Sequence, residues 1–418
     1  MKILMLSTYD KYGGAAIAAT RLMHALSDAG TDVSMIVMDK QSEDTRIMQA
    51  STFFPKRHFY RERLSIFLAN RLHRKNLFAV SIANCGADVT GTKAFAEADV
   101  IHLHWVNQGL LSLRTLDKIM HSGKPVVWTM HDMWPLTGIC HYAQECSRFT
   151  SECGNCPLLY SPQRNDLSRK IFCRKKDIYA QCDIRFVAVG THLAELAKLS
   201  TLLKNRSITI IPNMLDTGEF RQKDKAECRK KWGLPQDKDI ILFGAARIDD
   251  PIKGFEKLTK ATSLLRGRNN IHLLLFGRIK HKETLSGLEM PFTYAGTISD
   301  TEKLSELYSA ADISISASSF ETFGQTIIES MSCGCVPVAF DSGGPADIII
   351  HKENGFLTER HSPEALAEGI EWGLSESGGK NLDRNSIRAF VENRYSGQKV
   401  AVQYIRLYSS LTKKEKGT

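Results

Sequence analysis

The chain has 418 residues, of which 43% are hydrophobic and 24% charged, and its formal net charge is +9. This composition is typical of a globular protein with two or three domains, and it excludes collagen-like, coiled-coil and disordered chains. The positive surplus fits an anionic substrate, a nucleic acid or an acidic membrane surface, so its distribution along the chain has to decide between these partners.

The first residues, MKILMLSTYDKYGG, lack the pattern of a secretion signal, and no run approaches the ~20 apolar residues of a membrane span. We therefore expect a cytoplasmic protein. In that reducing compartment the ten cysteines are expected as free thiols or metal ligands more than as disulfides.

Short apolar runs alternate with helical patterns in the first half of the chain. The expected buried strands are 2–8, 33–38, 100–105, 126–130 and 186–189. A helix is predicted over 15–29, between the first two strands. This order predicts a doubly wound parallel sheet, which is the Rossmann-like form of an α/β domain.

The pattern starts again after residue 237 and predicts a second α/β domain. The expected strands are 239–245, 271–277, 313–317 and 336–340, with helices over 257–265, 301–310 and 326–331. We predict an N-terminal domain at 1–212, a C-terminal domain at 213–385 and a C-terminal helical segment at 386–418. The two sheets are expected to face each other across a cleft, with ligands at the carboxyl ends of the strands.

The stretch ETFGQTIIES places acidic groups and a helix start directly after an expected strand. The helix start would offer an anion, such as a diphosphate, the backbone N–H groups of Phe323, Gly324, Gln325 and Thr326. Glu329, two turns into the helix, could accept hydrogen bonds from a ribose diol, and Glu321 could orient sugar hydroxyls. The alternative is an ordinary helix with an acidic first turn.

Two further loops follow expected strands. Arg247 and Lys253 could neutralise a leaving diphosphate, although two basic residues alone also suit a solvated surface loop. Gly13 and Gly14 could let the backbone approach a phosphate, but they do not form the dinucleotide-binding pattern of three glycines.

His131 follows the expected strand at 126–130, where a ligand-binding residue would lie, although a lone histidine is more often structural. His104 is a weaker candidate at the end of the strand at 100–105. Both strand ends are expected at the same edge of the sheet.

A cysteine-rich insert is predicted at 138–160. Its four cysteines, of which the last two form a C-x2-C pair, are Cys140, Cys146, Cys153 and Cys156. Four thiolates suit tetrahedral zinc, and His141 could replace one of them. The alternatives are two disulfides or free thiols.

The positive charge is concentrated in residues 53–75, where seven Lys or Arg residues stand against Glu62. Phe53, Phe59, Tyr60 and other apolar residues interleave with them, which is typical of a segment that rests on an anionic membrane surface. A solvated helix face is the alternative. We expect no nucleic-acid partner, because no motif for one accompanies the charge.

In its order of motifs the chain resembles the retaining glycosyltransferases of the GT-B group, family 4. The resemblance rests on GGAAIAATRL, HD at His131, IIPNMLDTGEF, the R…KG loop at Arg247 and Lys253, and the E-x7-E stretch followed by GGPADII and NGFL. It covers nearly the whole chain. The cysteine-rich insert after HDMWPLTG resembles that of enzymes of colanic acid and other exopolysaccharide pathways.

The resemblance implies transfer of a hexose-type sugar from a UDP- or GDP-sugar to a glycan or lipid-linked acceptor in bacterial surface polysaccharide synthesis. It implies catalytic roles for His131, Glu321, Arg247 and Lys253. The donor-binding residues that it implies are Gly13, Gly14, Phe323, Gly324, Gln325, Thr326 and Glu329. It implies no cofactor for catalysis. It also implies that the C-terminal helix packs back on the first domain. A nucleotide-sugar epimerase, a sugar phosphorylase and a non-catalytic zinc-containing binding protein are the alternatives.

Overall fold

The computed structural model describes residues 1–418 except 52–53, 55, 359–360 and 415–418, and it leaves out the side chains of residues 282, 413 and 414. The chain forms two compact units. Unit 1 comprises Met1–Pro212 with Val400–Thr418, and unit 2 comprises Asn213–Lys399. Among the described helices, none has the length and apolar content needed to cross a membrane.

Unit 1 is built on a parallel seven-stranded sheet in the order β3-β2-β1-β4-β5-β6-β7. Its strands are β1 (Lys2–Tyr9), β2 (Asp32–Asp39), β3 (Ile47–Gln49), β4 (Val100–Leu103), β5 (Val126–Met130), β6 (Ile184–Ala188) and β7 (Ile208–Ile210). Its helices are α1 (Gly14–Asp28), α2 (Arg57–Ala69), α3 (Lys93–Glu97), α4 (Leu113–Met120), α5 (Leu167–Ala180), α6 (Thr191–Leu199) and most of α14 (Gly397–Lys414). Every residue of β4 and β5 is buried, which is why neither strand alternates between apolar and polar residues.

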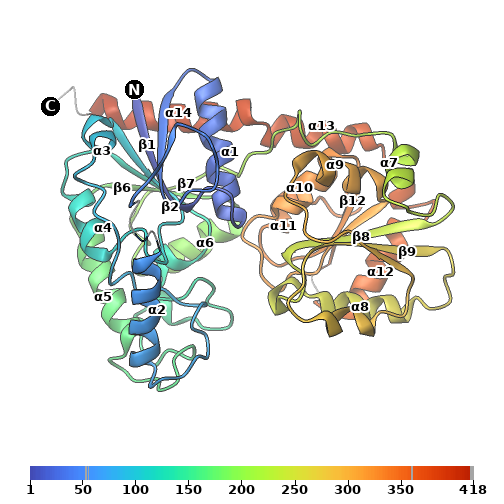
Figure 1. The fold of residues 1–418 in the computed structure, drawn as a ribbon, viewed down its shortest axis with the longest axis horizontal. Helices are drawn as coiled ribbons and strands as arrows, with labels where there is room; N and C mark the ends of the chain where they lie inside the picture. Colours follow the sequence, from blue (N-terminus) through green and yellow to red (C-terminus); the bar gives the residue numbers. More distant parts are fainter. Residues whose placement is uncertain (52–53, 55, 359–360, 415–418) are drawn as a thin grey trace. The chain divides into compact units, whose positions relative to one another are not determined.

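Unit 2 has a parallel six-stranded sheet in the order β10-β9-β8-β11-β12-β13, with helices on both faces (Figure 1). Its strands are β8 (Asp239–Arg247), β9 (Ile271–Arg278), β10 (Phe292–Tyr294), β11 (Ile313–Ser316), β12 (Val336–Phe340) and β13 (Phe356–Thr358). Its helices are α7 (Lys225–Lys231), α8 (Phe255–Leu264), α9 (Thr301–Ala310), α10 (Gln325–Ser332), α11 (Pro345–Ile348), α12 (Pro363–Gly373) and α13 (Arg384–Tyr395). The prediction of two doubly wound parallel-sheet domains is confirmed.

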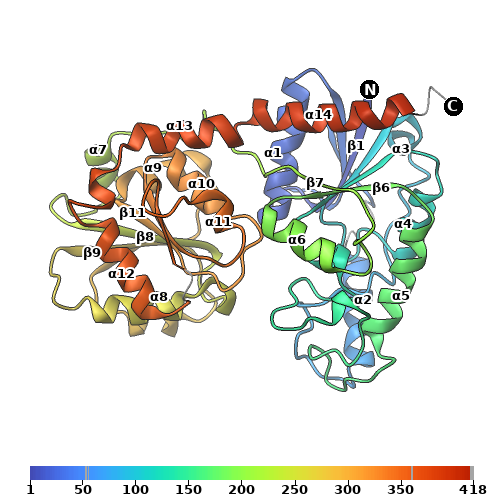
Figure 2. The same ribbon diagram turned by 180° about the vertical axis from the view of Figure 1, so that it is seen from behind.

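The C-terminal segment differs from the single helix expected over 386–418. Ser396 has an extended backbone and separates α13 from α14. The N–H of Leu215 donates to the carbonyl of Tyr395 at 2.7 Å, so a strand-like contact takes the place of helical hydrogen bonding there. Helix α14, red in Figure 2, then contributes Tyr404 and Tyr408 to the interior of unit 1.

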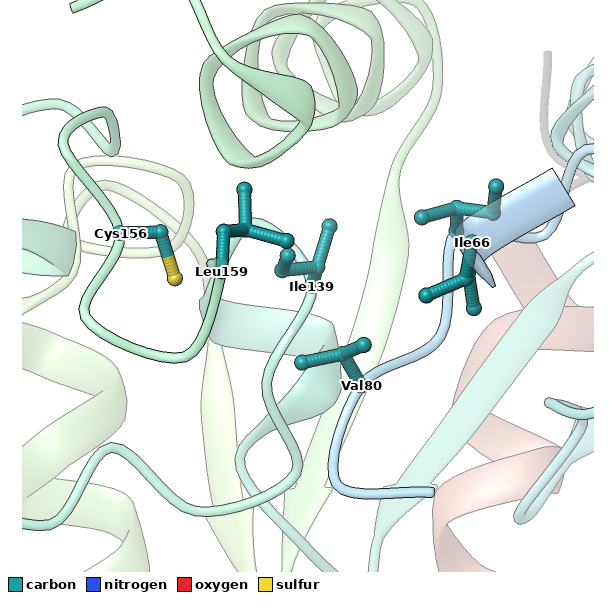
Figure 3. Packing of buried hydrophobic residues seen from close by; sticks show 6 residues of the cluster. Ile66, Val80, Ile139, Cys156 and Leu159 are labelled. Atoms are coloured by element: carbon teal, nitrogen blue, oxygen red, sulfur yellow. The ribbon is translucent and has the colours of Figure 1, made fainter. Parts of the chain in front are cut away.

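The cysteine-rich insert packs on α2 through a buried apolar cluster. The cluster consists of Ile66, Val80, Ile82, Ile139, Cys156 and Leu159. Figure 3 shows Leu159 beside Ile139, with Cys156 on one side of this pair and Val80 and Ile66 on the other. Burial of these side chains holds α2 and the insert together.

A buried ion pair fixes α2 in this position. Glu62, fully buried, accepts hydrogen bonds from the backbone N–H groups of Ile82 and Ala83, both at 2.7 Å. Its second oxygen pairs with Arg63 at 2.9 Å, and Arg63 donates to the carbonyl of Val80 at 2.9 Å. The carboxylate thus satisfies donors from both the helix and the segment at 80–83.

We expect Glu62→Ala to lower the free energy of unfolding by about 3–5 kcal/mol, the scale for removing one partner of a buried ion pair. The substitution leaves Arg63 buried without its carboxylate and two backbone N–H groups without an acceptor. Urea unfolding followed by circular dichroism measures the change. Glu195→Ala, at an exposed position of α6, is the control and should change stability by less than ~0.5 kcal/mol. Equal stability of the two variants would contradict this account.

Candidate functional site

In unit 2, Lys253 and Glu321 meet at the carboxyl end of the sheet. The Lys253 Nζ lies 2.8 Å from the Glu321 Oε2, with the lysine side chain 36% exposed and the glutamate side chain 20% exposed. The carboxylate raises the pKa of Lys253, so the ammonium is charged at neutral pH. Two residues that are 68 positions apart are therefore held as an ion pair that remains open to solvent.

Backbone contacts hold both residues in place. Glu321 donates its N–H to the carbonyl of Ser342 at 3.0 Å and accepts from the N–H of Gly344 at 2.7 Å. A Cβ at Gly344 would lie 2.4 Å from the Phe323 backbone, so only glycine permits this approach. Gly254, directly after Lys253, has φ +75°, and a Cβ there would lie 2.0 Å from the Ala317 carbonyl oxygen. Gly254 and Gly344 therefore bring the loops after β8 and β12 against the segment that follows β11.

The start of α10 lies beside this pair. Gly324 has φ +108° and precedes Gln325, the first residue of the helix. Thr326 and the next residue line a small pocket with a volume of about 10 Å³. The other lining residues are Leu242, Gly244, Tyr308, Ser314, Ile315 and Ser316. The pocket therefore lies among β8, β11, α9 and the first turn of α10, and its volume suits little more than one water molecule.

Three predicted donor-binding residues are more enclosed than the sequence indicates. Glu329 is 6% exposed and accepts a hydrogen bond from the Tyr308 hydroxyl at 3.1 Å. Phe323 is 3% exposed. Gln325 donates its side-chain amide to the Met214 carbonyl at 3.3 Å. The role of Glu329 at a ribose stays a prediction.

Arg247 interacts with acidic residues of its own loop. Its guanidinium lies 3.4 Å from Asp249 and 3.2 Å from Asp250. The backbone is irregular between Gly244 and Arg247, at the end of β8. Among the described residues, Lys253 therefore pairs with Glu321, whereas Arg247 pairs with Asp249 and Asp250.

In unit 1, Gly13 and Gly14 connect β1 to α1. Gly13 has φ +89°, a conformation that favours glycine, and a Cβ on either residue would meet nothing within 4 Å. The backbone at the start of this 15-residue helix is therefore open to an approaching group. Donor binding by these glycines stays a prediction.

The two histidines at the ends of β4 and β5 form a pair. His104 Nδ1 lies 2.9 Å from His131 Nε2. Burial lowers the pKa of His131 to about 4, although Asp132 opposes this shift, so the imidazole is neutral at pH 7. His131 is consequently suited to a neutral hydrogen bond and not to carrying a positive charge.

Asp132 anchors the cysteine-rich insert, a contact that the sequence analysis missed. It accepts hydrogen bonds from Trp105 Nε1 at 2.6 Å, His141 Nδ1 at 2.7 Å and the backbone N–H of Trp134 at 2.8 Å. Burial opposes ionisation, but His141 and the other donors hold the pKa of Asp132 below its usual value. His141 Nε2 bonds to Ser81 Oγ at 3.0 Å. Both nitrogens of His141 are thus engaged, so it is not placed to replace a cysteine as a metal ligand.

The four cysteines of the insert are free thiols. Burial raises the pKa of Cys140 to about 12 and that of Cys153 to about 11. The backbone N–H of Gly138 bonds to the Cys153 sulfur, and those of Leu158 and Leu159 bond to the Cys156 sulfur. Within the described part of the chain, no three side chains of His, Cys, Asp or Glu are arranged as ligands of a metal ion.

Two family models match the chain. The model of glycosyltransferase family 4 matches residues 12–219, and that of the glycosyl transferases group 1 matches residues 224–393. An uncharacterized glycosyltransferase of Methanocaldococcus jannaschii is 24% identical over 77% of this chain and 85% of its own. The putative colanic acid biosynthesis glycosyl transferase WcaC of Escherichia coli is 24% identical over 75% of each chain.

Solved structures share the fold. Sucrose-phosphate synthase from Thermosynechococcus elongatus has a TM-score of 0.69 at 20% identity, covering 98% of both chains. The Anabaena protein HepE, solved with UDP and glucose, has a TM-score of 0.65 at 18% identity, covering 98% of this chain and 100% of its own. These likenesses confirm the predicted GT-B fold. Because the two family models together match most of the sequence, the chain belongs to the family 4 glycosyltransferases and is a glycosyltransferase.

Proposed function

We propose that the protein transfers a hexose-type sugar from a UDP- or GDP-sugar to a glycan or lipid-linked acceptor in bacterial surface polysaccharide synthesis, with retention at the anomeric carbon. The observation that carries this proposal is the Lys253–Glu321 ion pair beside the start of α10. Two comparisons support it: HepE was solved with UDP-glucose, and WcaC is named for colanic acid biosynthesis.

The ion pair suits a nucleotide-diphosphate sugar chemically. The Lys253 ammonium would stabilise the negative charge that grows on the leaving diphosphate, together with N–H groups at the start of α10. Arg247 would join by turning from its acidic neighbours to a phosphate. These cations supply the positive charge in our proposal, which needs no metal cofactor for catalysis.

The carboxylate has a different role from the cations. Glu321 would accept hydrogen bonds from hydroxyls of the transferred sugar, while its contact with Lys253 links sugar orientation to the diphosphate. In unit 1, we assign His131 a hydrogen bond to the transferred sugar, made by its neutral imidazole.

We expect Glu321→Ala and Lys253→Ala each to lower kcat/KM by roughly 100-fold or more, the scale for losing an orienting group or a group that stabilises developing charge. Turnover is measured by nucleotide release over a panel of UDP- and GDP-sugars, with membrane extract as acceptor. Glu256→Ala and Lys260→Ala are matched controls, because they break an exposed ion pair of 2.6 Å in α8.

Activity equal to wild type in both site variants would overturn the site assignment. Conversion of the donor without acceptor would instead indicate an epimerase. Absence of nucleotide release with every donor would contradict the proposed donor class.

We further propose that α2 rests on an anionic membrane surface, at the inner face of the plasma membrane. The exposed fractions of Tyr60, Leu64 and Leu68, spaced four residues apart, are 64%, 56% and 58%. The exposed cations around them are Lys56, Arg57, Arg61, Arg71, Arg74 and Lys75. Arg63 is buried with Glu62, so the net surface charge of this segment is unchanged from the sequence count. Phe53 lies outside the described residues.

We expect Leu64→Glu to weaken binding to vesicles containing phosphatidylglycerol at least several-fold, because it removes apolar area and adds a negative charge. Leu199→Glu is the matched control, since Leu199 is 57% exposed in α6 of the same unit. Vesicle sedimentation measures both variants, with phosphatidylcholine vesicles as the neutral comparison. Equal binding by the two variants would contradict the proposal.

Structural zinc at the insert stays a prediction. The N–H donors on the Cys153 and Cys156 sulfurs fit thiolate ligands, whereas the arrangement of the four thiols does not form a metal site as it stands. Metal binding would therefore require the four thiols to rearrange.

Elemental analysis of protein purified without chelator should find about one zinc per chain, the stoichiometry of a four-thiolate site. Cys153→Ser should lose the metal, and Cys228→Ser, at a buried cysteine of unit 2, should keep it. Metal-free wild-type protein in which Cys146 reacts with a thiol reagent would reject zinc.

A further inference from the structure

His104 lies between two other histidines in the interior of unit 1. It is 2% exposed, its Nδ1 lies 2.9 Å from His131 Nε2, and its ring centroid is 4.1 Å from that of His102. The second nitrogen of His104, Nε2, is buried and has no hydrogen-bond partner among the described residues. The sequence predicted His104 only as a weaker candidate for the site.

The contacts determine where the protons lie. A neutral imidazole has one N–H donor and one acceptor nitrogen. A buried N–H without an acceptor is rarer and costlier than an unused lone pair, so Nε2 of His104 is the nitrogen without a proton. His104 therefore carries its proton on Nδ1 and donates it to His131 Nε2. His131 in turn carries its own proton on Nδ1.

A second layer of hydrogen bonds holds the ring of His102, which packs against His104 at an interplanar angle of 42°. His102 Nδ1 lies 2.8 Å from the Tyr408 hydroxyl, and His102 Nε2 lies 2.8 Å from Thr129 Oγ1. The Thr129 hydroxyl is also 2.9 Å from the Tyr404 hydroxyl. Both nitrogens of His102 are thus held, one of them by a side chain of α14. Burial keeps this ring neutral by lowering the pKa of His102 to about 3.

We propose that His104 is a positioning residue that fixes the ring orientation and the Nδ1–H tautomer of His131. The proposal rests on the sugar contact assigned to His131 above. In it, α14 steadies His102 through Tyr408, His102 packs against His104, and His104 presents its N–H to His131. The acceptor nitrogen of His131 is thereby occupied, and its Nδ1–H is a donor of defined direction.

The primary test is the protonation pattern of His131 in protein labelled with 15N-histidine, without any substrate. Two-dimensional NMR distinguishes the two neutral tautomers and the imidazolium, and His131→Gln identifies the signals of His131 by removing them. The wild-type protein should show His131 protonated at Nδ1. His104→Phe should abolish that single pattern, and His104→Asn, whose amide N–H takes the place of Nδ1–H, should retain it. His121→Phe, at a histidine side chain that is 55% exposed, is the control and should leave the pattern unchanged.

The second test uses the nucleotide sugar with the highest turnover in the donor screen. His104→Phe should lower kcat by roughly 10- to 100-fold, the scale for misplacing a group that contacts the substrate, with a smaller change in KM. His104→Asn should recover most of the loss. If His104→Phe does not fold, Tyr408→Phe, which removes only the hydroxyl held by His102, should give the same changes in smaller degree.

The two readouts separate the failure of this inference from failure of the proposed function. Protonation of His131 at Nε2, or a pattern that His104→Phe leaves unchanged, would overturn the positioning role whatever the activity. The expected NMR pattern together with unchanged turnover in His104→Phe would support the proton assignment and overturn the sugar contact of His131.

Discussion

Desolvation of polar side chains at the carboxyl ends of β4 and β5 is the constraint on which this part of unit 1 depends. Imidazole, indole, hydroxyl and carboxylate groups lie there in a nearly dry interior, where each unpaired group costs free energy. Most of these groups form hydrogen bonds with one another. His104 pairs with His131, and His102 pairs with Thr129 and Tyr408. Asp132 accepts hydrogen bonds from Trp105 and His141. The same burial keeps the histidines neutral, so the site gains directed hydrogen bonds and no positive charge.

Unit 2 meets a different constraint, because the opposite charges of Lys253 and Glu321 lie together there and stay open to a ligand. Here glycine provides the close approach. Without a Cβ, Gly254 fits against the Ala317 carbonyl and Gly344 fits against Phe323, so the loops after β8 and β12 converge on the end of β11. Lys253 and Glu321 meet as a consequence. In the proposed function, the charged groups thus belong to unit 2 and the neutral imidazole belongs to unit 1.

The fold class could be predicted because buried parallel strands are short and uniformly apolar, a pattern visible without tertiary information. Strands β3, β7, β10 and β13 were missed, since three-residue strands leave too little pattern. The convergence of Lys253 and Glu321 was expected only through motif resemblance. Arg247 pairs with Asp249 and Asp250 of its own loop, which the motif resemblance did not indicate.

Two further misses share one cause, which is that a partner distant along the chain decides the environment of a residue. Glu62 and Arg63 were counted as surface charges, yet the segment at 80–83 covers them. His141 was considered as a metal ligand, yet Asp132 and Ser81 occupy its nitrogens. The exposed stripe of α2 was predictable because it depends only on helical spacing within thirteen residues.

The contribution of α14 to unit 1 also orders events during synthesis. The hydrogen bond between Tyr408 and His102 spans 306 positions, and that between Tyr404 and Thr129 spans 275. The polar groups toward the carboxyl ends of β4 and β5 therefore lack these partners until the ribosome has made nearly the entire chain. Unit 2, whose residues follow one another without interruption from Asn213 to Lys399, is complete before unit 1. Because synthesis starts at the amino end, unit 1 begins first and is completed last. Its interior closes only when the C-terminal segment packs on it, which closes a loop that contains all of unit 2.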